Sequence, residues 1–202
     1  MSTGNPIEFW FDFSSGYGYL AAQEIEALGE RVKRPILWRP YMLGTAFKVT
    51  GMRGLSSTPL KGDYARHDWA RAARKMGVPF APPKDHPKIA LAATRAFYWI
   101  EANRPGEEKR FAREVFGQYY SGKLDTSDAD AVAALAGSLG LETAKVRTGL
   151  EAAEIKERAR AISESAVQRG IFGSPFFVVD GEPFWGWDRI PMIEEWIRTG
   201  GW

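Results

Sequence analysis

The first hydrophobic segment of the chain, residues 7–13, has apolar side chains at every second position, at Ile7, Phe9, Phe11 and Phe13. A period of two is typical of a β-strand, and Trp10 on the opposite face indicates a strand covered on both sides. Residues 17–28 have the apolar spacing of a helix, which Gly29 is expected to end. Residues 36–39 form a second short strand. The order strand, helix, strand favours a parallel βαβ unit.

From residue 43 to about residue 170 the alternating pattern disappears and helical periodicity takes its place. The pattern predicts five or six helices, at residues 63–76, 88–102, 107–120, 128–139, 142–150 and 151–168. Gly77 and Gly140 are expected to end two of these helices, and Ser127 or Asp128 is expected to cap the fourth. A helical block therefore separates two strand-rich parts of the chain.

The C-terminal part returns to strands. A hairpin is predicted, with strands at residues 176–179 and 182–185. Between them, Asp180-Gly181 suits the positive φ angles of a type I′ turn. Asp188 is expected to cap a last helix over residues 189–198.

The predicted architecture is α/β, with the order βαβ, helical insert, ββα, which is the order of a thioredoxin-like fold. We expect residues 1–42 and 170–202 to form the thioredoxin-like domain, and residues 43–169 to form an inserted all-helical domain.

Composition narrows the classes of protein to which the chain can belong. Of its 202 residues, 45% are hydrophobic and 26% are charged, as in an ordinary folded protein. The net charge is only +2 and no basic stripe is visible, which argues against nucleic-acid binding. No apolar run approaches the roughly 20 residues of a membrane span, and no secretory signal is visible. We therefore expect a cytoplasmic protein that binds neither nucleic acid nor membranes.

The chain has no cysteine and only two histidines. Without cysteine it forms no disulfide, offers no thiolate ligand or nucleophile, and cannot carry out thiol–disulfide exchange. Two histidines also leave little material for a metal site or a Ser-His-Asp triad. His67 lies on the polar side of its predicted helix and His86 in a proline-rich loop, so we interpret both as surface residues.

In a thioredoxin-like fold the active site lies where the first helix begins, facing a proline ahead of the third strand. The corresponding positions here are Ser14-Ser15 and Ser174-Pro175. The free N–H groups and the dipole of a helix N-terminus favour an anion, including a thiolate, to which a serine hydroxyl can donate. Ser14 or Ser15 could instead serve only to cap the helix.

Residues 11–21, with the sequence FDFSSGYGYLA, resemble the opening motif of 2-hydroxychromene-2-carboxylate isomerases, which are relatives of kappa-class glutathione transferases within the DsbA-like group. The resemblance extends over essentially the whole chain, through residues 38–40, 50–51, 59–64, 68, 71–74, 77–79, 170–181 and 184–189. Its C-terminal part is the most specific.

This resemblance implies a glutathione site at the start of the first helix. Ser15 matches the serine that activates the glutathione sulfur, in place of the first cysteine of a redox CxxC motif. Pro175 matches a cis-proline, and the backbone of Ser174 would pair with the peptide backbone of glutathione. Without the resemblance, Pro175 could equally be an ordinary proline at the start of a strand.

The resemblance also implies contacts to the two ends of the tripeptide. Trp187 and Asp188 match the pair that holds the γ-glutamyl end, where Asp188 accepts from the ammonium group. Lys61 matches a lysine that reaches the carboxylate side. Spacing alone suits Asp188 equally to a helix cap and Lys61 to a solvated surface charge.

Four residues depart from the pattern of the family. Gly16 replaces a usual proline, and Gly18 stands where a small polar residue is common. Met52 stands where kappa-class relatives often place an asparagine that contacts glutathione, and Trp187 replaces a smaller polar residue.

We therefore expect a glutathione-dependent isomerase that opens the ring of a small chromene-type aromatic substrate and isomerises the product from cis to trans. One alternative is a kappa-like glutathione transferase for another electrophile. The other is a thioredoxin-fold binding protein without catalysis, which Gly16, Met52 and Trp187 favour. Lys48, Arg53 and Lys61 are candidates to bind a substrate carboxylate, and the resemblance implies a homodimer.

Overall fold

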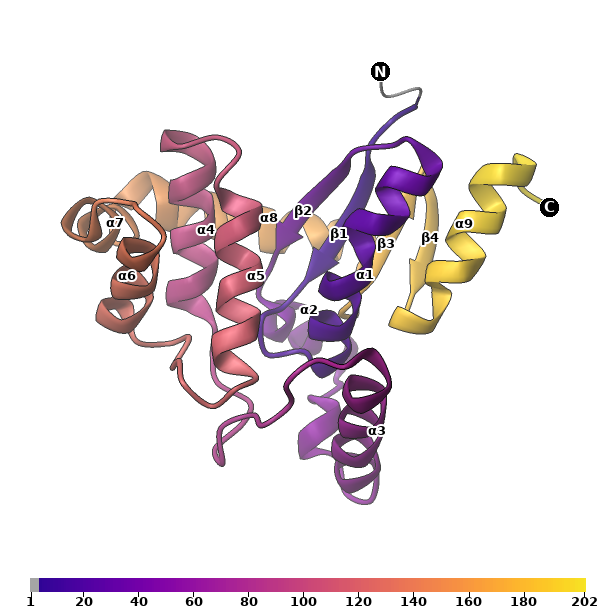
Figure 1. The fold of residues 1–202 in the computed structure, drawn as a ribbon, viewed down its shortest axis with the longest axis horizontal. Helices are drawn as coiled ribbons and strands as arrows, with labels where there is room; N and C mark the ends of the chain where they lie inside the picture. Colours follow the sequence, from indigo (N-terminus) through magenta and orange to yellow (C-terminus); the bar gives the residue numbers. More distant parts are fainter. Residues whose placement is uncertain (1–3) are drawn as a thin grey trace.

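The structure, a computed structural model, describes residues 4–202. Its centre is a four-stranded sheet in the order β2-β1-β3-β4 (Figure 1). Strand β1 (Ile7–Phe11) pairs in parallel with β2 (Ile36–Pro40) and antiparallel with β3 (Phe176–Val179), which in turn pairs antiparallel with β4 (Glu182–Trp185). The predicted α/β class and thioredoxin-like fold are confirmed.

Both faces of the sheet are covered, as the pattern of β1 predicts. On one face, Phe9 stacks on Phe177 with ring centroids 5.5 Å apart, in the core to which helix α1 (Gly16–Val32) contributes. On the other face, Trp10 belongs to a smaller apolar cluster with residues of helix α8 (Ala153–Gln168). The sheet is thus the middle layer of the molecule.

Helix α1 runs past the glycine at which we expected it to end. It continues to Val32, and Lys33 adopts the left-handed conformation that closes it. Gly29 is buried inside the helix, where an added Cβ would lie 2.8 Å from the carbonyl oxygen of Arg34 and 2.9 Å from Ile36 Cγ1. The predicted end was therefore wrong, because Gly29 permits close packing against the next segment and does not cap the helix.

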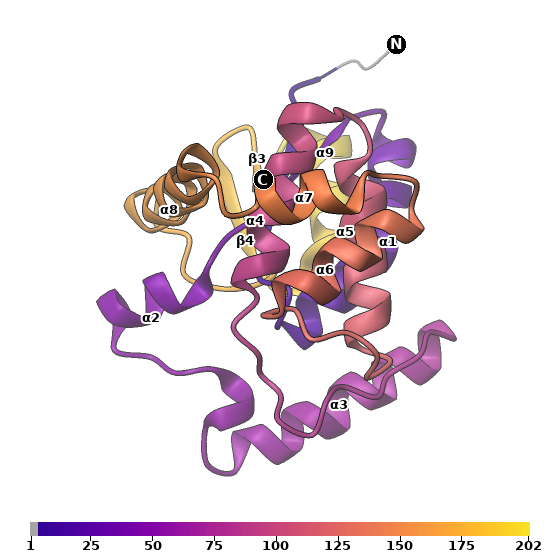
Figure 2. The same cartoon turned by 90° about the vertical axis from the view of Figure 1, so that its left-hand side faces the viewer.

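The segment between β2 and β3 is helical, as predicted. Its elements are α2 (Leu43–Thr50), the 3₁₀ turn η1 (Leu55–Ser57), α3 (Lys61–Met76), α4 (Leu91–Asn103), α5 (Glu108–Tyr119), α6 (Ala129–Ser138), α7 (Thr143–Gly149) and α8. Gly77 closes α3 and Asp128 caps α6, as predicted. Figures 1 and 2 show that α3 lies below the sheet, apart from the bundle of α4 to α7. Within residues 4–202, no helix is long and apolar enough to cross a membrane.

The hairpin is confirmed at the C-terminal end, but the cap of the last helix is not. Asp180 and Gly181 have φ angles of 52° and 93°, the positive values that a type I′ turn requires. A 3₁₀ turn, η2 (Trp187–Arg189), precedes the last helix, α9 (Ile190–Thr199). Asp188 lies inside η2, makes no cap, and forms an ion pair of 3.2 Å with Arg189. The predicted capping role of Asp188 was therefore wrong.

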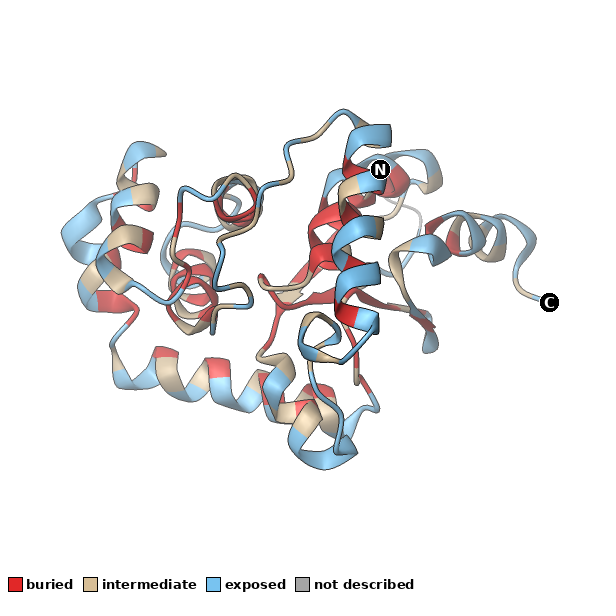
Figure 3. Cartoon of the chain, turned by 90° about the horizontal axis from the view of Figure 1, so that it is seen from below, coloured by how far each residue is buried: buried red, intermediate tan, exposed pale blue. Residues whose placement is uncertain are grey.

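One apolar core runs from the sheet into the helices. Phe116 of α5 lies 5.3 Å from Phe11 and 5.0 Å from Phe13, measured between ring centroids. In Figure 3 the buried residues occupy the strands and the inner faces of the helices. The division into residues 1–42 and 170–202 against residues 43–169 stays a prediction, and residues 1–3 of it lie outside the described residues.

Candidate functional site

The two predicted halves of the site meet at the start of α1. Ser15 caps the helix: its Oγ accepts from the N–H of Gly18 at 3.0 Å, and the same hydroxyl donates to the carbonyl of Ser174 at 2.8 Å. The peptide bond between Ser174 and Pro175 is cis, and we name the loop that contains these two residues the proline loop. Ser15 is therefore the helix cap that the sequence allowed and also faces the proline loop, while its role towards a thiolate stays a prediction.

Several backbone donors around Ser15 are left unpaired. Among residues 4–202, no group accepts from the N–H of Gly16 or of Tyr17, the first two residues of α1. The N–H of Ser174 likewise has no acceptor within the part of the chain that the structure describes. Unpaired N–H groups at a helix start attract anions, and the unpaired N–H of Ser174 can donate to a peptide carbonyl.

Asp12 connects the loop before α1 to the proline loop. Its carboxylate accepts from the N–H of Ser14 at 2.8 Å and from the N–H of Leu43 at 3.0 Å. Its own N–H donates to Ser174 Oγ at 2.9 Å. Burial raises the pKa of this carboxyl group, while the backbone N–H of Ser14 and that of Leu43 act against the rise. Asp12 therefore fixes the loop before α1, the proline loop and the start of α2 relative to one another.

Trp69 of α3 explains the glycine at the start of α1. An added Cβ on Gly16 would lie 2.6 Å from Trp69 Cε2 and 2.8 Å from Trp69 Cγ. The indole also meets the Tyr17 ring edge to face at 5.7 Å and is only 4% exposed. Gly16, where the family usually has proline, is thus the residue that leaves room for this indole over the first turn.

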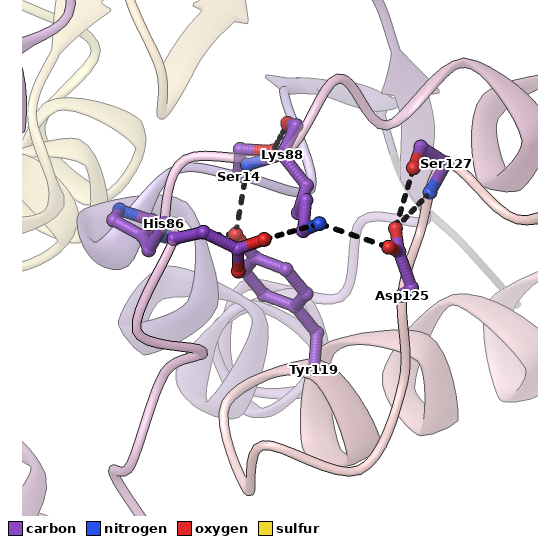
Figure 4. A network of polar contacts seen from close by, with 7 residues as sticks. Ser14, His86, Lys88, Tyr119, Asp125 and Ser127 are labelled. Atoms are coloured by element: carbon purple, nitrogen blue, oxygen red, sulfur yellow. Dashed lines mark hydrogen bonds and ion pairs between the residues drawn. The ribbon is translucent and has the colours of Figure 1, made fainter.

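His86 is part of the site wall, so its interpretation as a surface residue was wrong. Its Nδ1 lies 2.8 Å from the Tyr119 hydroxyl (Figure 4). Its ring meets Trp69 edge to face at 5.7 Å. Burial, and secondly the charge of Arg66, lower the pKa of His86 from 6.5 to about 4. The imidazole is therefore neutral at physiological pH. A lone histidine in a proline-rich loop gave no signal of this, whereas His67 is exposed as expected.

The connection between α3 and α4, residues 77–90, lies beside the start of α1; we name it the strap. Ser14 Oγ donates to the carbonyl of Lys88, and the N–H of Lys88 donates to the Tyr119 hydroxyl at 3.1 Å. The Lys88 ammonium pairs with Asp85 and, at 3.0 Å, with Asp125, and these two carboxylates raise the pKa of Lys88 (Figure 4). The strap is therefore tied to α1 and to the α5–α6 connection.

The other predicted site residues, Trp187, Asp188 and Lys61, are not hydrogen-bonded to Ser15 in the part of the chain that the structure describes. Trp187 Nε1 donates to Glu24 at 2.9 Å, so its indole N–H already has an acceptor. The N–H of Gly186 donates to the carbonyl of Pro175 at 3.1 Å, which holds this turn beside the proline loop. Asp188 and Lys61 are exposed, and within residues 4–202 neither forms a hydrogen bond or an ion pair with Ser15.

Tyr17 marks an acidic side of the site. Its hydroxyl donates to Asp68 at 2.8 Å. Burial first, and then this hydrogen bond to Asp68, raise the pKa of Tyr17, and the charge of Asp188 adds to the rise. A cationic ligand group near Tyr17 would therefore find negative charge.

Comparison with known proteins gives relatives of the kind that the sequence resemblance names. A 2-hydroxychromene-2-carboxylate isomerase from Sphingobium xenophagum is 26% identical over 197 residues, with 95% of this chain and 97% of the relative covered. Glutathione S-transferase kappa 2 from Caenorhabditis elegans is 24% identical over 210 residues, covering 98% and 93%. A solved 2-hydroxychromene-2-carboxylate isomerase superposes with a TM-score of 0.85 at 22% identity, over 96% of this chain and 94% of that one.

These relatives confirm the resemblance, and the solved structure shows the same fold. The sequence profile of the DSBA-like thioredoxin domain matches residues 6–198, which is nearly the whole chain. The relatives of this chain include isomerases and kappa-class transferases, which indicates an enzyme of one of these kinds. The chain belongs to the DsbA-like thioredoxin-domain family.

Proposed function

We propose that this protein is a glutathione-dependent isomerase of 2-hydroxychromene-2-carboxylate-type aromatic compounds. The observation that carries the proposal is the placement of Ser15. Its hydroxyl lies beside two unpaired N–H groups at the start of α1 and against the cis-proline loop, in a chain without cysteine. A site built to stabilise a sulfur anion, but lacking a thiol of its own, fits a thiol that arrives on a small molecule.

The residues present fit glutathione along its length. The unpaired N–H of Ser174 and the carbonyl that precedes Pro175 suit the peptide backbone of the tripeptide. Asp188, held next to the proline loop through Gly186, would accept from the γ-glutamyl ammonium group. Trp187 would contribute its ring, because Glu24 already accepts from its N–H, and Lys61 would reach the carboxylate side.

When bound, glutathione supplies a sulfur nucleophile for reversible addition to the conjugated double bond of the substrate. A free thiol has a pKa of about 8.5, so only a few per cent is ionised at neutral pH. The N–H groups of Gly16 and Tyr17 would raise that fraction, together with the hydroxyl of Ser15 once it turns from the carbonyl of Ser174 to the sulfur. Trp69, Tyr17 and the strap provide an aromatic wall for the substrate ring.

The first test is a calorimetric titration with reduced glutathione, followed by an isomerisation assay. We expect binding in the micromolar-to-millimolar range that weakens in Asp188→Ala. Free glutathione recovered after turnover identifies an isomerase, whereas a stable glutathione adduct identifies a kappa-like transferase. The transferase is the second candidate function, because a relative from Caenorhabditis elegans is a kappa-class glutathione transferase. No binding at high glutathione would favour a binding protein without catalysis.

Ser15→Ala tests the role of the hydroxyl. We expect turnover to fall by about 10²-fold or more, and the pKa of the bound thiol, read from thiolate absorbance, to rise. Ser15→Ala also removes a helix cap and lowers stability by about 1 kcal/mol, so the thiol pKa is the decisive readout. Ser138→Ala, at an exposed site on α6, is the matched control. An unchanged thiol pKa and unchanged turnover in Ser15→Ala would contradict the assignment.

A further inference from the structure

Three buried polar atoms without a hydrogen-bond partner belong to a group of packed rings beside the start of α1. Within residues 4–202, nothing pairs with Trp69 Nε1, His86 Nε2 or the Tyr120 hydroxyl. The His86 ring lies 5.7 Å from the Trp69 ring and 6.1 Å from the Tyr120 ring, measured between centroids. A buried donor left unpaired has lost the hydrogen bonds that it makes to water when exposed, so several of them in one group of rings call for an explanation.

The pairing of Tyr119 is compatible with a proton on His86 Nε2. The Tyr119 hydroxyl accepts from the N–H of Lys88, which leaves its own proton available to His86 Nδ1. With Nδ1 as the acceptor, the neutral imidazole carries its hydrogen on Nε2. In this tautomer the unpaired atom of His86 is a donor, like the indole N–H of Trp69.

The indole donor of Trp69 lies beside the first turn of α1. Its neighbouring ring atom, Cε2, would be 2.6 Å from a Cβ on Gly16. That turn has unpaired N–H groups of its own, and the charge of Arg66 acts on His86 from α3. Unpaired donors thus lie on this part of the site, and the group that satisfies them is an acceptor.

We propose that Trp69 Nε1 and His86 Nε2 donate to a carbonyl or carboxylate oxygen of the aromatic substrate. This inference rests on the proposed function and names two substrate-binding residues for the same site. Addition of a nucleophile to a carbonyl-conjugated double bond moves the π electrons onto the carbonyl oxygen, and expulsion of the nucleophile returns them. Donors aimed at that oxygen stabilise the charge while it is there. Both nitrogens are closed to solvent, so the substrate reaches them by separating the two rings.

Direct binding of an unreactive probe tests the two donors without requiring turnover. The probe is 2-oxo-4-phenylbutanoate, an aromatic 2-oxo acid without the conjugated double bond, titrated into the glutathione-saturated protein. Trp69→Phe and His86→Phe keep an aromatic ring and remove the donor. We expect each variant to weaken probe binding by about tenfold. In the isomerisation assay of the substrate, each variant should lower kcat more than it raises KM. Glutathione binding should stay unchanged.

Two further variants separate this result from a general loss of structure. His86→Gln places a side-chain N–H near the position of Nε2 and should restore probe binding. Trp202→Phe, at an exposed indole near the C-terminus, should have no effect. 4-Phenylbutanoate, which lacks the ketone, tells the carbonyl from the carboxylate: equal losses with both probes assign the carboxylate.

Unchanged probe affinity in Trp69→Phe and His86→Phe, with glutathione still bound, would overturn the inference and leave the proposed function standing. Failure of the native chain to bind glutathione would instead overturn the proposed function itself.

Discussion

Two adjacent tyrosines on the site wall differ only in whether their hydroxyl groups are paired. Both are fully buried, but Tyr119 pairs with His86 and Lys88 while the Tyr120 hydroxyl has no partner in residues 4–202. We expect Tyr120→Phe to raise the free energy of unfolding by about 1 kcal/mol, because it removes an unsatisfied group. Tyr119→Phe should lower it by about 1–3 kcal/mol. Urea unfolding of the two variants decides this, and equal changes would contradict the pairing.

His86 makes the stability of the protein depend on pH in a narrow range. Its pKa is about 4 in the folded chain against 6.5 for a free side chain. Between these two values the unfolded chain binds a proton that the folded chain does not, so stability falls as the pH is lowered from 6.5 to about 4. The unfolding free energy of the native chain minus that of His86→Phe should therefore fall as the pH is lowered through this range. A difference that stays constant over this range would show that His86 titrates normally.

How far the site could be predicted depends on the distance along the chain between its parts. Ser15 and Pro175 follow from local signals, a serine ahead of a helix and a proline ahead of a strand. Trp69 and His86 reach the same place from α3 and the strap, more than 50 residues after Ser15 in the sequence. Only their packing against Gly16 and Tyr119 shows that they belong to the site, and that packing leaves no trace in local sequence.

At the scale of helices and strands, glycines with different surroundings should respond oppositely to the same change. An added Cβ on Gly29 in α1 would lie 2.8 Å from a backbone oxygen, whereas one on Gly117 in α5 would meet nothing within 4 Å. Gly29→Ala should therefore lower the free energy of unfolding by about 1–3 kcal/mol through overpacking. Gly117→Ala should raise it by about 0.5–1 kcal/mol, because alanine is the better helix former. Thermal unfolding of both variants checks the signs, and stabilisation by Gly29→Ala would contradict the close packing.

Elements were predictable where the residues that start or end them are neighbours in sequence. The hairpin has its Asp180-Gly181 turn and α6 has its Asp128 cap. Helix α2 was not predicted, because the side chain of its N-cap residue, Met42, makes no capping hydrogen bond. The acceptor for the N–H of Leu43 is Asp12, which lies 31 positions earlier, so the start of α2 exists only after folding.

At the scale of the whole molecule, the shared core should make the sheet and the helices unfold together. Phe116 of α5 packs on Phe11 and Phe13 of the sheet region. We expect Phe116→Ala to lower the free energy of unfolding by about 3–5 kcal/mol. Far-ultraviolet and near-ultraviolet circular dichroism should still follow one coincident transition. Two separated transitions, of which Phe116→Ala shifts only the helical one, would show that residues 43–169 fold as an independent domain.

The fit between Gly16 and Trp69 also constrains how the chain can have diverged from its relatives. A side chain at position 16 and an indole at position 69 exclude each other, because a Cβ there would lie 2.6 Å from Trp69 Cε2. The two substitutions can therefore be accepted in only one order. A lineage arriving at the present pair must lose its side chain at position 16 before it gains the large ring, and a lineage leaving it must shrink the ring first. The steric fit therefore sets the order of the two substitutions, with glycine at position 16 preceding the indole at position 69.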